Sequence, residues 1–174
     1  MNNKLPSREQ AIELLRENHC SPIVIRHCEV VAELALEIAD KLEKNGLKVD
    51  RDLVETGAIL HDLGRSKSHG IDHGVVGANI AFSAGLSDSL VRIIKRHVGG
   101  GITADEAEAF GWPKDVYVPV TLEEKIVSYA DKLIDQSKRV SIDIEIKKLQ
   151  MENKREPAER VRKLHEDITS LLGN

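Results

Sequence analysis

Residues 21–46 read SPIVIRHCEVVAELALEIADKLEKNG, which is the pattern of one long amphipathic helix. Ser21 followed by Pro22 is typical of a helix start, because serine caps the first turn and proline suits the first helical position. Asn45 and Gly46 are typical of a helix end. Between them, apolar residues recur at intervals of three and four, which predicts one buried stripe. The stripe consists of Ile23, Val30, Val31, Leu34, Ile38 and Leu42.

The sequence on both sides of this helix shows the same kind of pattern. Ser7 with Gln10 and Thr121 with Glu124 have the spacing of capping boxes, in which two side chains satisfy the first backbone N–H groups of a helix. We expect further helices over about residues 7–18, 50–64, 72–84, 87–98, 103–110, 121–135 and 141–172, the last broken near Glu156 and Pro157. We expect no strand and no internal repeat. The predicted fold class is all-α, a single-domain helical bundle with a C-terminal helical extension.

Composition excludes several classes of protein. The chain has 174 residues, 41% hydrophobic and 31% charged, which fits one ordered globular domain. Its net charge of −4 argues against a nucleic-acid partner, and no apolar run is long enough for a membrane span. Residues 1–6 lack the apolar segment of a secretion signal, and Cys20 and Cys28 form no CxxC motif. We therefore expect a cytoplasmic protein.

Histidine is the unusual feature of this composition. Aromatic residues make up only 3% of the chain, but there are seven histidines, and His27, His61, His69, His73 and His97 lie within one region. His61 and Asp62 stand at a predicted helix end, where two adjacent side chains can turn toward one site. Asp131 lies within a predicted helix, and burying its carboxylate there is costly unless it is paired or bound to a metal. Imidazoles and carboxylates from separate helices predict a metal site.

The order His27, His61-Asp62, Asp131 on a helical chain resembles the HD superfamily of metal-dependent phosphohydrolases. The run His61-Asp62-Leu63-Gly64-Arg65 is similar to the HDIG variant of its motif. The chain as a whole resembles small archaeal HDIG proteins, and residues 73–78 resemble bacterial HD hydrolases that cleave diadenosine tetraphosphate. The resemblance implies an HD-type bundle over residues 20–136, with an N-terminal helix in residues 1–19 and a charged extension in residues 137–174.

The same resemblance implies a site for two divalent ions. His27, His61, Asp62 and Asp131 would hold one ion, and Asp62, His73 and His97 the other. Four imidazoles favour Fe, Mn, Co, Ni or Zn over Mg, which prefers oxygen ligands. Two such ions activate a water molecule as hydroxide and orient a phosphoryl group. The predicted activity is hydrolysis of a phosphoester or phosphoanhydride bond in a small nucleotide-like substrate, with cyclic phosphodiesters and dinucleoside polyphosphates favoured.

Phosphoryl transfer also needs positive charge around the phosphate oxygens. We expect Asp62, Arg65 and Lys67 to take part in catalysis. Arg65 and Lys67 are also expected to bind the substrate, together with His69 and Arg96. Two roles are compatible with Gly99–Gly101: a simple connection between helices, or a loop that holds phosphate or acts as the hinge of a lid. Three aromatic residues in the following segment have the chemistry to stack on a base. They are Phe110, Trp112 and Tyr117.

The sequence is also compatible with two other functions. One is a nucleotide-binding regulatory HD module without catalysis, although inactive HD domains usually lose a core ligand and this chain keeps all four. The other is a helical scaffold assembled through its C-terminal helices. The basic residues there alternate with acidic ones, which is typical of a solvated helix face or a homodimer contact rather than of a nucleic-acid surface. They are Lys147, Lys148, Lys154, Arg155, Arg160, Arg162 and Lys163.

Overall fold

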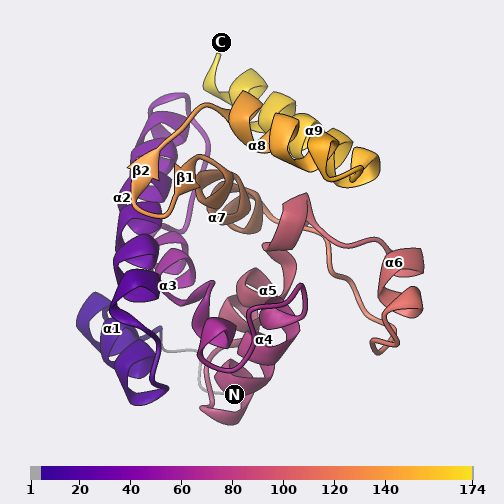
Figure 1. The fold of residues 1–174 in the computed structure, drawn as a ribbon. Helices are drawn as coiled ribbons and strands as arrows, with labels where there is room; N and C mark the ends of the chain where they lie inside the picture. The colour runs from indigo at the N-terminus through magenta and orange to yellow at the C-terminus, as the bar shows by residue number, and fades with distance from the viewer. Residues whose placement is uncertain (1–4, 174) are drawn as a thin grey trace.

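The computed structural model describes residues 5–173, and within them the chain folds as a bundle of helices (Figure 1). In chain order the elements are α1 (Arg8–Glu17), α2 (Pro22–Lys44), α3 (Arg51–Leu60), the 3₁₀ turn η1 (Leu63–Ser66), α4 (His73–Ser83), α5 (Asp88–Arg96), the 3₁₀ turn η2 (Val98–Gly100), α6 (Ala104–Ala109), α7 (Leu122–Lys132), β1 (Ile134–Asp135), β2 (Lys138–Arg139), α8 (Ile142–Met151) and α9 (Arg155–Leu172). The predicted all-α class is confirmed. The first four residues of the predicted N-terminal segment, where we expect no secretion signal, lie outside the described residues.

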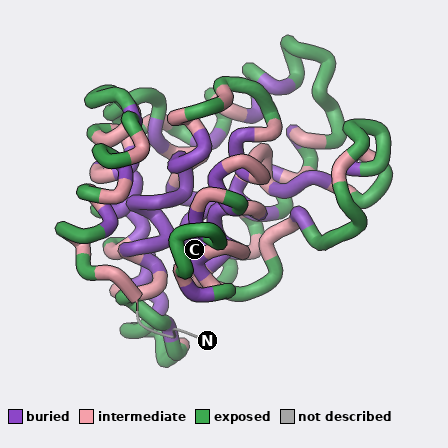
Figure 2. The backbone as a smooth tube through the Cα atoms, turned by 90° about the horizontal axis from the view of Figure 1, so that it is seen from below, coloured by how far each residue is buried: buried purple, intermediate pink, exposed green. Residues whose placement is uncertain are grey.

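Helix α2 forms where residues 21–46 predict one long helix, and it is the central element of the bundle. The Ser21 side chain accepts a hydrogen bond from the Val24 N–H, and the helix ends at Asn45. It packs against α3 and α7 and lines a continuous aliphatic core. Figure 2 shows the buried residues in purple in the interior of the bundle. One member of the predicted stripe is an exception. Ile23 is 71% exposed because it stands in the first turn, at the mouth of a cleft instead of in the core.

Side-chain caps set the starts of several other helices. The capping boxes that begin at Ser7 and Thr121 are both complete in α1 and α7. Asp50 and Ser87 cap α3 and α5 through their side chains. These helices therefore begin where the sequence predicts, because a cap needs only residues within one turn.

The prediction of no strand is wrong between α7 and α8. Helix α7 ends at Lys132, short of the predicted residue 135, and β1 and β2 follow as an antiparallel hairpin of two residues each. Gln136 in the turn has a φ of 56°, a left-handed conformation that a continuing helix cannot accommodate. Arg139 on β2 forms an ion pair with Glu37 of α2. The hairpin thus contacts a distant helix, which a local pattern does not reveal.

The predicted break near Glu156 and Pro157 is also displaced. Helix α8 ends at Met151, and α9 begins at Arg155, so that Pro157 lies in the first turn of α9. Proline is tolerated there because the first N–H groups of a helix have no partner within the helix. Helices α8 and α9 pack against each other as a hairpin, which we call the C-terminal hairpin, and α9 also contacts α7 and η2. In Figure 1 this hairpin covers one end of the bundle.

A close backbone contact brings the turn after α3 against α4. A Cβ atom at Gly64 would lie 1.8 Å from the carbonyl oxygen of His73 and 2.6 Å from the N atom of Gly77. Only glycine permits this approach. It places the segment after His61 and Asp62 directly beside the first turn of α4, which begins with His73. Among residues 5–173, no helix combines the length and the apolar character that crossing a membrane requires.

Candidate metal centre

His61 and Asp62 lie where helix α3 ends. His61 keeps helical angles, whereas Asp62, with φ −97° and ψ 17°, leaves the helix and begins η1. This change of direction lets both side chains enter one site, although adjacent helical residues point about 100° apart. Both are buried, with exposed fractions of 0% and 8%. The structure therefore brings the two residues together as a pair facing the same interior space.

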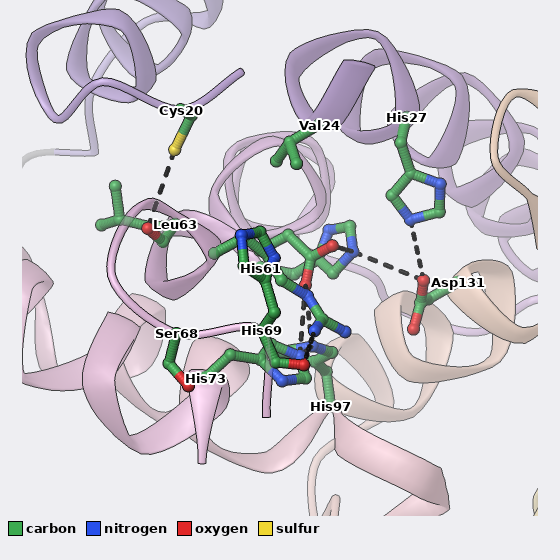
Figure 3. Close-up of polar contacts among 12 residues, drawn as sticks. Cys20, Val24, His27, His61, Leu63, Ser68, His69, His73, His97 and Asp131 are labelled. Atoms are coloured by element: carbon green, nitrogen blue, oxygen red, sulfur yellow. Dashed lines mark hydrogen bonds and ion pairs between the residues drawn. The ribbon is translucent and has the colours of Figure 1, made fainter. Parts of the chain in front are cut away.

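The first group of ligands comes from α2, α3 and α7. The Nε2 atom of His27 is 3.0 Å from Oδ1 of Asp131, and the Nε2 atom of His61 is 3.4 Å from the same oxygen. Figure 3 shows the two side chains of His27 and Asp131 pointing toward each other across the site. Donor atoms of these three residues lie close enough together to hold a metal ion.

The second group surrounds Asp62. Its Oδ1 atom is 3.2 Å from Nε2 of His73 and 3.5 Å from Nε2 of His97, while its Oδ2 atom is 3.8 Å from Nε2 of His61. The donor atoms of His61, Asp62 and His97 also lie close enough to hold an ion. The two oxygens of Asp62 therefore face different groups of imidazoles, which is the arrangement that a bridging carboxylate requires.

Backbone carbonyls fix the tautomer of all four imidazoles. Each Nδ1 atom lies within 2.6 to 2.8 Å of a carbonyl oxygen, to which it donates a hydrogen bond. The pairs are His27 with Gln136, His61 with Ala58, His73 with Gly70 and His97 with Ile94. Whenever such a ring is neutral, its proton is on Nδ1, and the lone pair on Nε2 points into the site. Histidines that bind metals are usually oriented by such a second hydrogen bond.

A cation fits the unsatisfied atoms that this arrangement leaves. Nε2 of His73 and Nε2 of His97 are 3.0 Å apart, yet two lone pairs cannot form a hydrogen bond with each other. Burial lowers the pKa of His97 to about 4, so this ring stays neutral. The buried Nε2 atom of His61 has no hydrogen-bond partner among the described residues. Such groups are costly in an interior unless something binds them, and a metal ion does so.

The charges of the site point the same way. Burial alone raises the pKa of a carboxyl group, but His61 and His73 hold the pKa of Asp62 well below its ordinary value. Burial also raises the pKa of Asp131, but Lys132 and His27 outweigh this effect and hold the pKa of its carboxyl group well below the ordinary value. Both side chains are therefore carboxylates. Burial opposes a charge on His61, yet Asp62 raises its pKa well above the ordinary value, so the cluster attracts a positive charge.

A cleft of about 670 Å³ opens onto this cluster. Arg65 and His69, two of the predicted substrate-binding residues, line it. The Nε atom of Arg65 is 3.4 Å from Oδ1 of Asp62, and its Nη1 atom donates to the carbonyl oxygen of His69. A guanidinium group therefore stands at the edge of the cluster. Lys67 is exposed in the same turn but does not line the cleft, so the structure does not bring it to the site.

Arg96 does not face the cleft, contrary to the prediction. Its Nη1 atom donates to both carboxylate oxygens of Glu124, at 2.9 and 3.0 Å, and its Nε atom donates to the carbonyl oxygen of Val116. The reason is helical geometry, because Arg96 and His97 are adjacent and point about 100° apart. With His97 directed into the site, Arg96 is directed toward α7, where it forms a buried ion pair.

Lys132 is a cleft residue that the sequence analysis missed. Its Nζ atom is 2.7 Å from Oδ2 of Asp131, the oxygen that does not face His27, and its side chain is 12% exposed. It lines the cleft beside the metal-ligand cluster. The available signal was its position next to Asp131 in the last turn of α7.

The glycine run and the aromatic residues have structural positions. Gly99 lines the cleft, but a Cβ atom on Gly100 would meet the backbone of α9 at 3.2 Å, so the run permits close packing of the C-terminal hairpin. The predicted stacking residues pack on one another instead of lining the cleft. They are Phe110, Trp112 and Tyr117.

Comparisons with known proteins extend these findings. The chain is 46% identical over 166 residues to an uncharacterized protein of Methanocaldococcus jannaschii, covering 94% of this chain and 98% of that protein. It is 38% identical over 169 residues to the tRNA (cytidine(56)-2'-O)-methyltransferase of Picrophilus torridus, covering 97% of this chain and 48% of that protein. The chain therefore spans about half the length of this methyltransferase.

Solved structures and a family model agree on the fold. Crystal structures of the HD domain of the L. monocytogenes phosphodiesterase PgpH match with TM-scores of 0.57 and 0.58 at 18% identity, the second in complex with cyclic-di-AMP. Both matches cover 94% of this chain, and they cover 97% and 95% of those chains. The sequence model of the HD domain matches residues 24–134, from the start of α2 to the first strand, and thus spans every residue of the metal-ligand cluster. The chain belongs to the HD-domain family.

Proposed function

We propose that the protein is a metal-dependent phosphohydrolase that cleaves a phosphoester or phosphoanhydride bond in a small nucleotide-like substrate. One observation carries this proposal: four imidazoles, each oriented by a backbone carbonyl, direct their Nε2 lone pairs toward two buried carboxylates. A polar cluster of this kind is costly to bury without a cation. Membership of the HD-domain family supports the assignment of the chemistry.

The donor set favours two transition-metal ions. His27, His61 and Asp131 form one group, and Asp62 with His73 and His97 forms the other. Imidazole nitrogen is a good ligand for Fe, Mn, Co, Ni and Zn, whereas Mg prefers oxygen. When bound, two such ions supply a water of lowered pKa and positive charge for the phosphoryl oxygens. Asp62, whose two oxygens face different imidazoles, would supply a donor atom to each group.

Two cations of this chain complement the charge of a bound phosphate. Arg65 and Lys132 line the cleft beside Asp62 and Asp131 respectively. Both are already oriented by these carboxylates, so little side-chain entropy is lost when a phosphate binds. We assign them to the stabilisation of the phosphate oxygens in the transition state. His69, which also lines the cleft, is assigned to substrate binding, and Lys67 and Arg96 have no role in this proposal.

The cleft is large enough for a nucleotide-like substrate. Its volume of about 670 Å³ falls within the usual range for sites that bind small molecules. A cyclic phosphodiester is a reasonable first substrate, because a related HD domain was crystallised with cyclic-di-AMP. A dinucleoside polyphosphate is the second. The link to a tRNA methyltransferase concerns a protein twice as long and adds no substrate to this proposal.

Metal content and turnover test the proposal together. The protein is purified anaerobically, its metals are measured by elemental analysis, and a panel of phosphodiesters, cyclic dinucleotides and dinucleoside polyphosphates is assayed with the metal found. We expect about two equivalents of a transition metal and hydrolysis of at least one substrate. Protein that contains no metal, or that hydrolyses nothing while binding nucleotides tightly, contradicts the proposal, and the second result identifies a regulatory HD module.

A further inference from the structure

The C-terminal hairpin forms the wall of the cleft opposite the metal-ligand cluster. Along α8, one stripe of side chains at intervals of three and four lines the cleft, and the first turns of α9 continue it. The stripe consists of Ile144, Glu145, Lys148, Leu149 and Glu152, and α9 adds Pro157 and Arg160. The basic residues of this hairpin are thus divided between two surfaces. Lys148 and Arg160 face the cleft, whereas their neighbour Lys147 is exposed and does not line it.

Arg160 is held in place by the segment around α6. Its Nε atom donates to the carbonyl oxygen of Gly101 at 3.0 Å, and its Nη2 atom donates to Glu106 at 2.9 Å. Its side chain is 18% exposed. The Nη1 group has no hydrogen-bond partner among the described residues. A guanidinium group held on two sides with one free edge is well prepared to bind an anion, because arginine loses little freedom when its fork is already oriented.

Lys148 is a cation of this wall whose amino group is not held by a carboxylate of the described residues, although its charge acts on nearby Glu152. Lys154 forms an ion pair with Glu152, and Arg160 forms one with Glu106. Lys148 forms no ion pair with any residue in the part of the chain that the structure describes, although it lines the cleft. The remaining acidic residue of the α8 stripe, Glu145, is among the charges that act on Lys132, so it belongs to the metal side of the cleft.

Resting on the proposed function, we propose that Lys148 and Arg160 form a second phosphate site. The reacting phosphate of the substrate lies at the metal-ligand cluster, and a second phosphate lies against the C-terminal hairpin. The substrate class is therefore a nucleotide with two phosphate groups set apart, as in a cyclic dinucleotide or a dinucleoside polyphosphate, rather than a simple monophosphate ester. Ile23 and Ile144, both exposed where the cleft opens, provide apolar surface for the nucleoside between the two phosphates.

The test compares a substrate with two phosphates and one with a single phosphate. Cyclic di-AMP and bis(p-nitrophenyl) phosphate are assayed with the metal that the purified protein contains. For Lys148→Gln we expect KM for cyclic di-AMP to rise on the order of tenfold, with little change in kcat, because one charge-assisted hydrogen bond is lost. The kinetics with bis(p-nitrophenyl) phosphate are expected to stay the same. Lys147→Gln is the matched control and should leave both substrates unaffected.

Arg160→Lys is a second variant, which keeps the positive charge and removes the planar guanidinium group with its several N–H donors. Since Arg160 also joins α9 to the α6 segment, its thermal unfolding midpoint is measured alongside. Loss of a second phosphate site raises KM for cyclic di-AMP alone, whereas a general distortion of the cleft weakens both substrates. If Lys148→Gln and Arg160→Lys leave the ratio of kcat/KM for the two substrates unchanged, the second phosphate site is disproved even though the hydrolase proposal stands.

A binding measurement separates the two proposals if turnover is absent. Calorimetry of the purified protein with a hydrolysis-resistant phosphorothioate analogue of cyclic di-AMP reports the second phosphate site without catalysis. We expect Lys148→Gln to weaken binding on the order of tenfold and Lys147→Gln to leave it unchanged. Binding without turnover would disprove the proposed hydrolase activity and support the second phosphate site. Equal binding by the wild type and Lys148→Gln, or no binding by either, would disprove the second phosphate site.

Discussion

At the scale of single residues, the candidate site depends on where protons lie. Four backbone carbonyls accept the Nδ1 protons of the imidazoles, so every Nε2 lone pair is directed inward. His73 and His97 illustrate the consequence, because their Nε2 atoms lie 3.0 Å apart while both Nδ1 atoms face backbone carbonyls. Only a cation satisfies both atoms at once. The ligand atoms are therefore prepared for metal by the backbone and not by further side chains.

His97→Asn tests this interpretation directly. The variant removes one Nε2 metal ligand. We expect metal affinity to fall by at least the amount that is typical when only a hydrogen-bond partner of a ligand is lost, which is on the order of 10- to 100-fold. Elemental analysis is expected to show less bound metal, and phosphoesterase activity should fall with it. His19→Asn is the matched control, since His19 has a φ of 63°, which asparagine tolerates, and lies outside the cleft. Equal metal contents in both variants would contradict the assignment of His97.

At the scale of elements, close packing decides which side chains meet. Gly64 lets the turn after α3 touch the first turn of α4, and this contact sets the position of His73 relative to Asp62. The ion pair of Arg96 with Glu124 joins α5 to α7 in the same way, and these helices carry or precede His97 and Asp131.

Gly64→Ala tests the close contact between η1 and α4. The added Cβ would overlap the His73 carbonyl oxygen, so the two elements must separate. We expect a loss of about 3 kcal/mol in the free energy of unfolding, measured in urea, together with weaker metal binding. Gly85→Ala is the control because a Cβ there meets nothing within 4 Å, and only its φ of 73° costs about 1 to 2 kcal/mol. A Gly64→Ala protein that is as stable as the control would show that the contact is not needed.

Arg96→Met separates a structural role from substrate binding. Removing one partner of a buried ion pair leaves the other charge unpaired, so we expect a loss of about 3 to 5 kcal/mol in stability. The folded variant should keep its metal content and its KM, because Arg96 does not line the cleft. Arg26→Met, at an exposed ion pair, should change stability by less than about 1 kcal/mol. A specific rise in KM for Arg96→Met would restore the original assignment to substrate binding.

At the scale of the whole molecule, the candidate metal centre joins most of the bundle. Its ligands come from α2, the end of α3, α4, the end of α5, and α7, and the C-terminal hairpin faces it across the cleft. An ion bound only in the folded state would therefore act as a cross-link between elements that are far apart in sequence. The molecule is expected to be less stable whenever this link is absent.

Metal removal is the corresponding prediction. A ligand present at a hundred times its dissociation constant adds about 2.7 kcal/mol to stability, which for a domain of this size raises the thermal midpoint by about 5 to 10 °C. Dialysis against a chelator should lower the midpoint by this amount, and adding back the native metal should restore it. The His97→Asn variant should respond less than wild type. A midpoint that is independent of chelator would argue against a metal in this centre.

The helices are predictable from the sequence because their signals are local. The caps at Ser7, Ser21 and Thr121 act within one turn, and the apolar period of α2 needs only its own residues. The β1–β2 hairpin is not predictable in this way, since its strands have two residues each and its contact with α2 through Arg139 joins distant parts of the chain. This unpredicted turn matters for the site, because the carbonyl oxygen of Gln136 orients His27.

The fold class and most helix starts are predictable from the chain alone, because caps and apolar periodicity are local properties, and the order of His and Asp residues together with the family resemblance suggests the candidate ligands. Which long cations reach the cleft depends on how the helices pack. Arg96 turns away to Glu124, Lys132 reaches Asp131, and Arg160 is held opposite by residues of the α6 segment. The direction of a long side chain depends on helices packed from distant parts of the chain, and no local pattern contains that information.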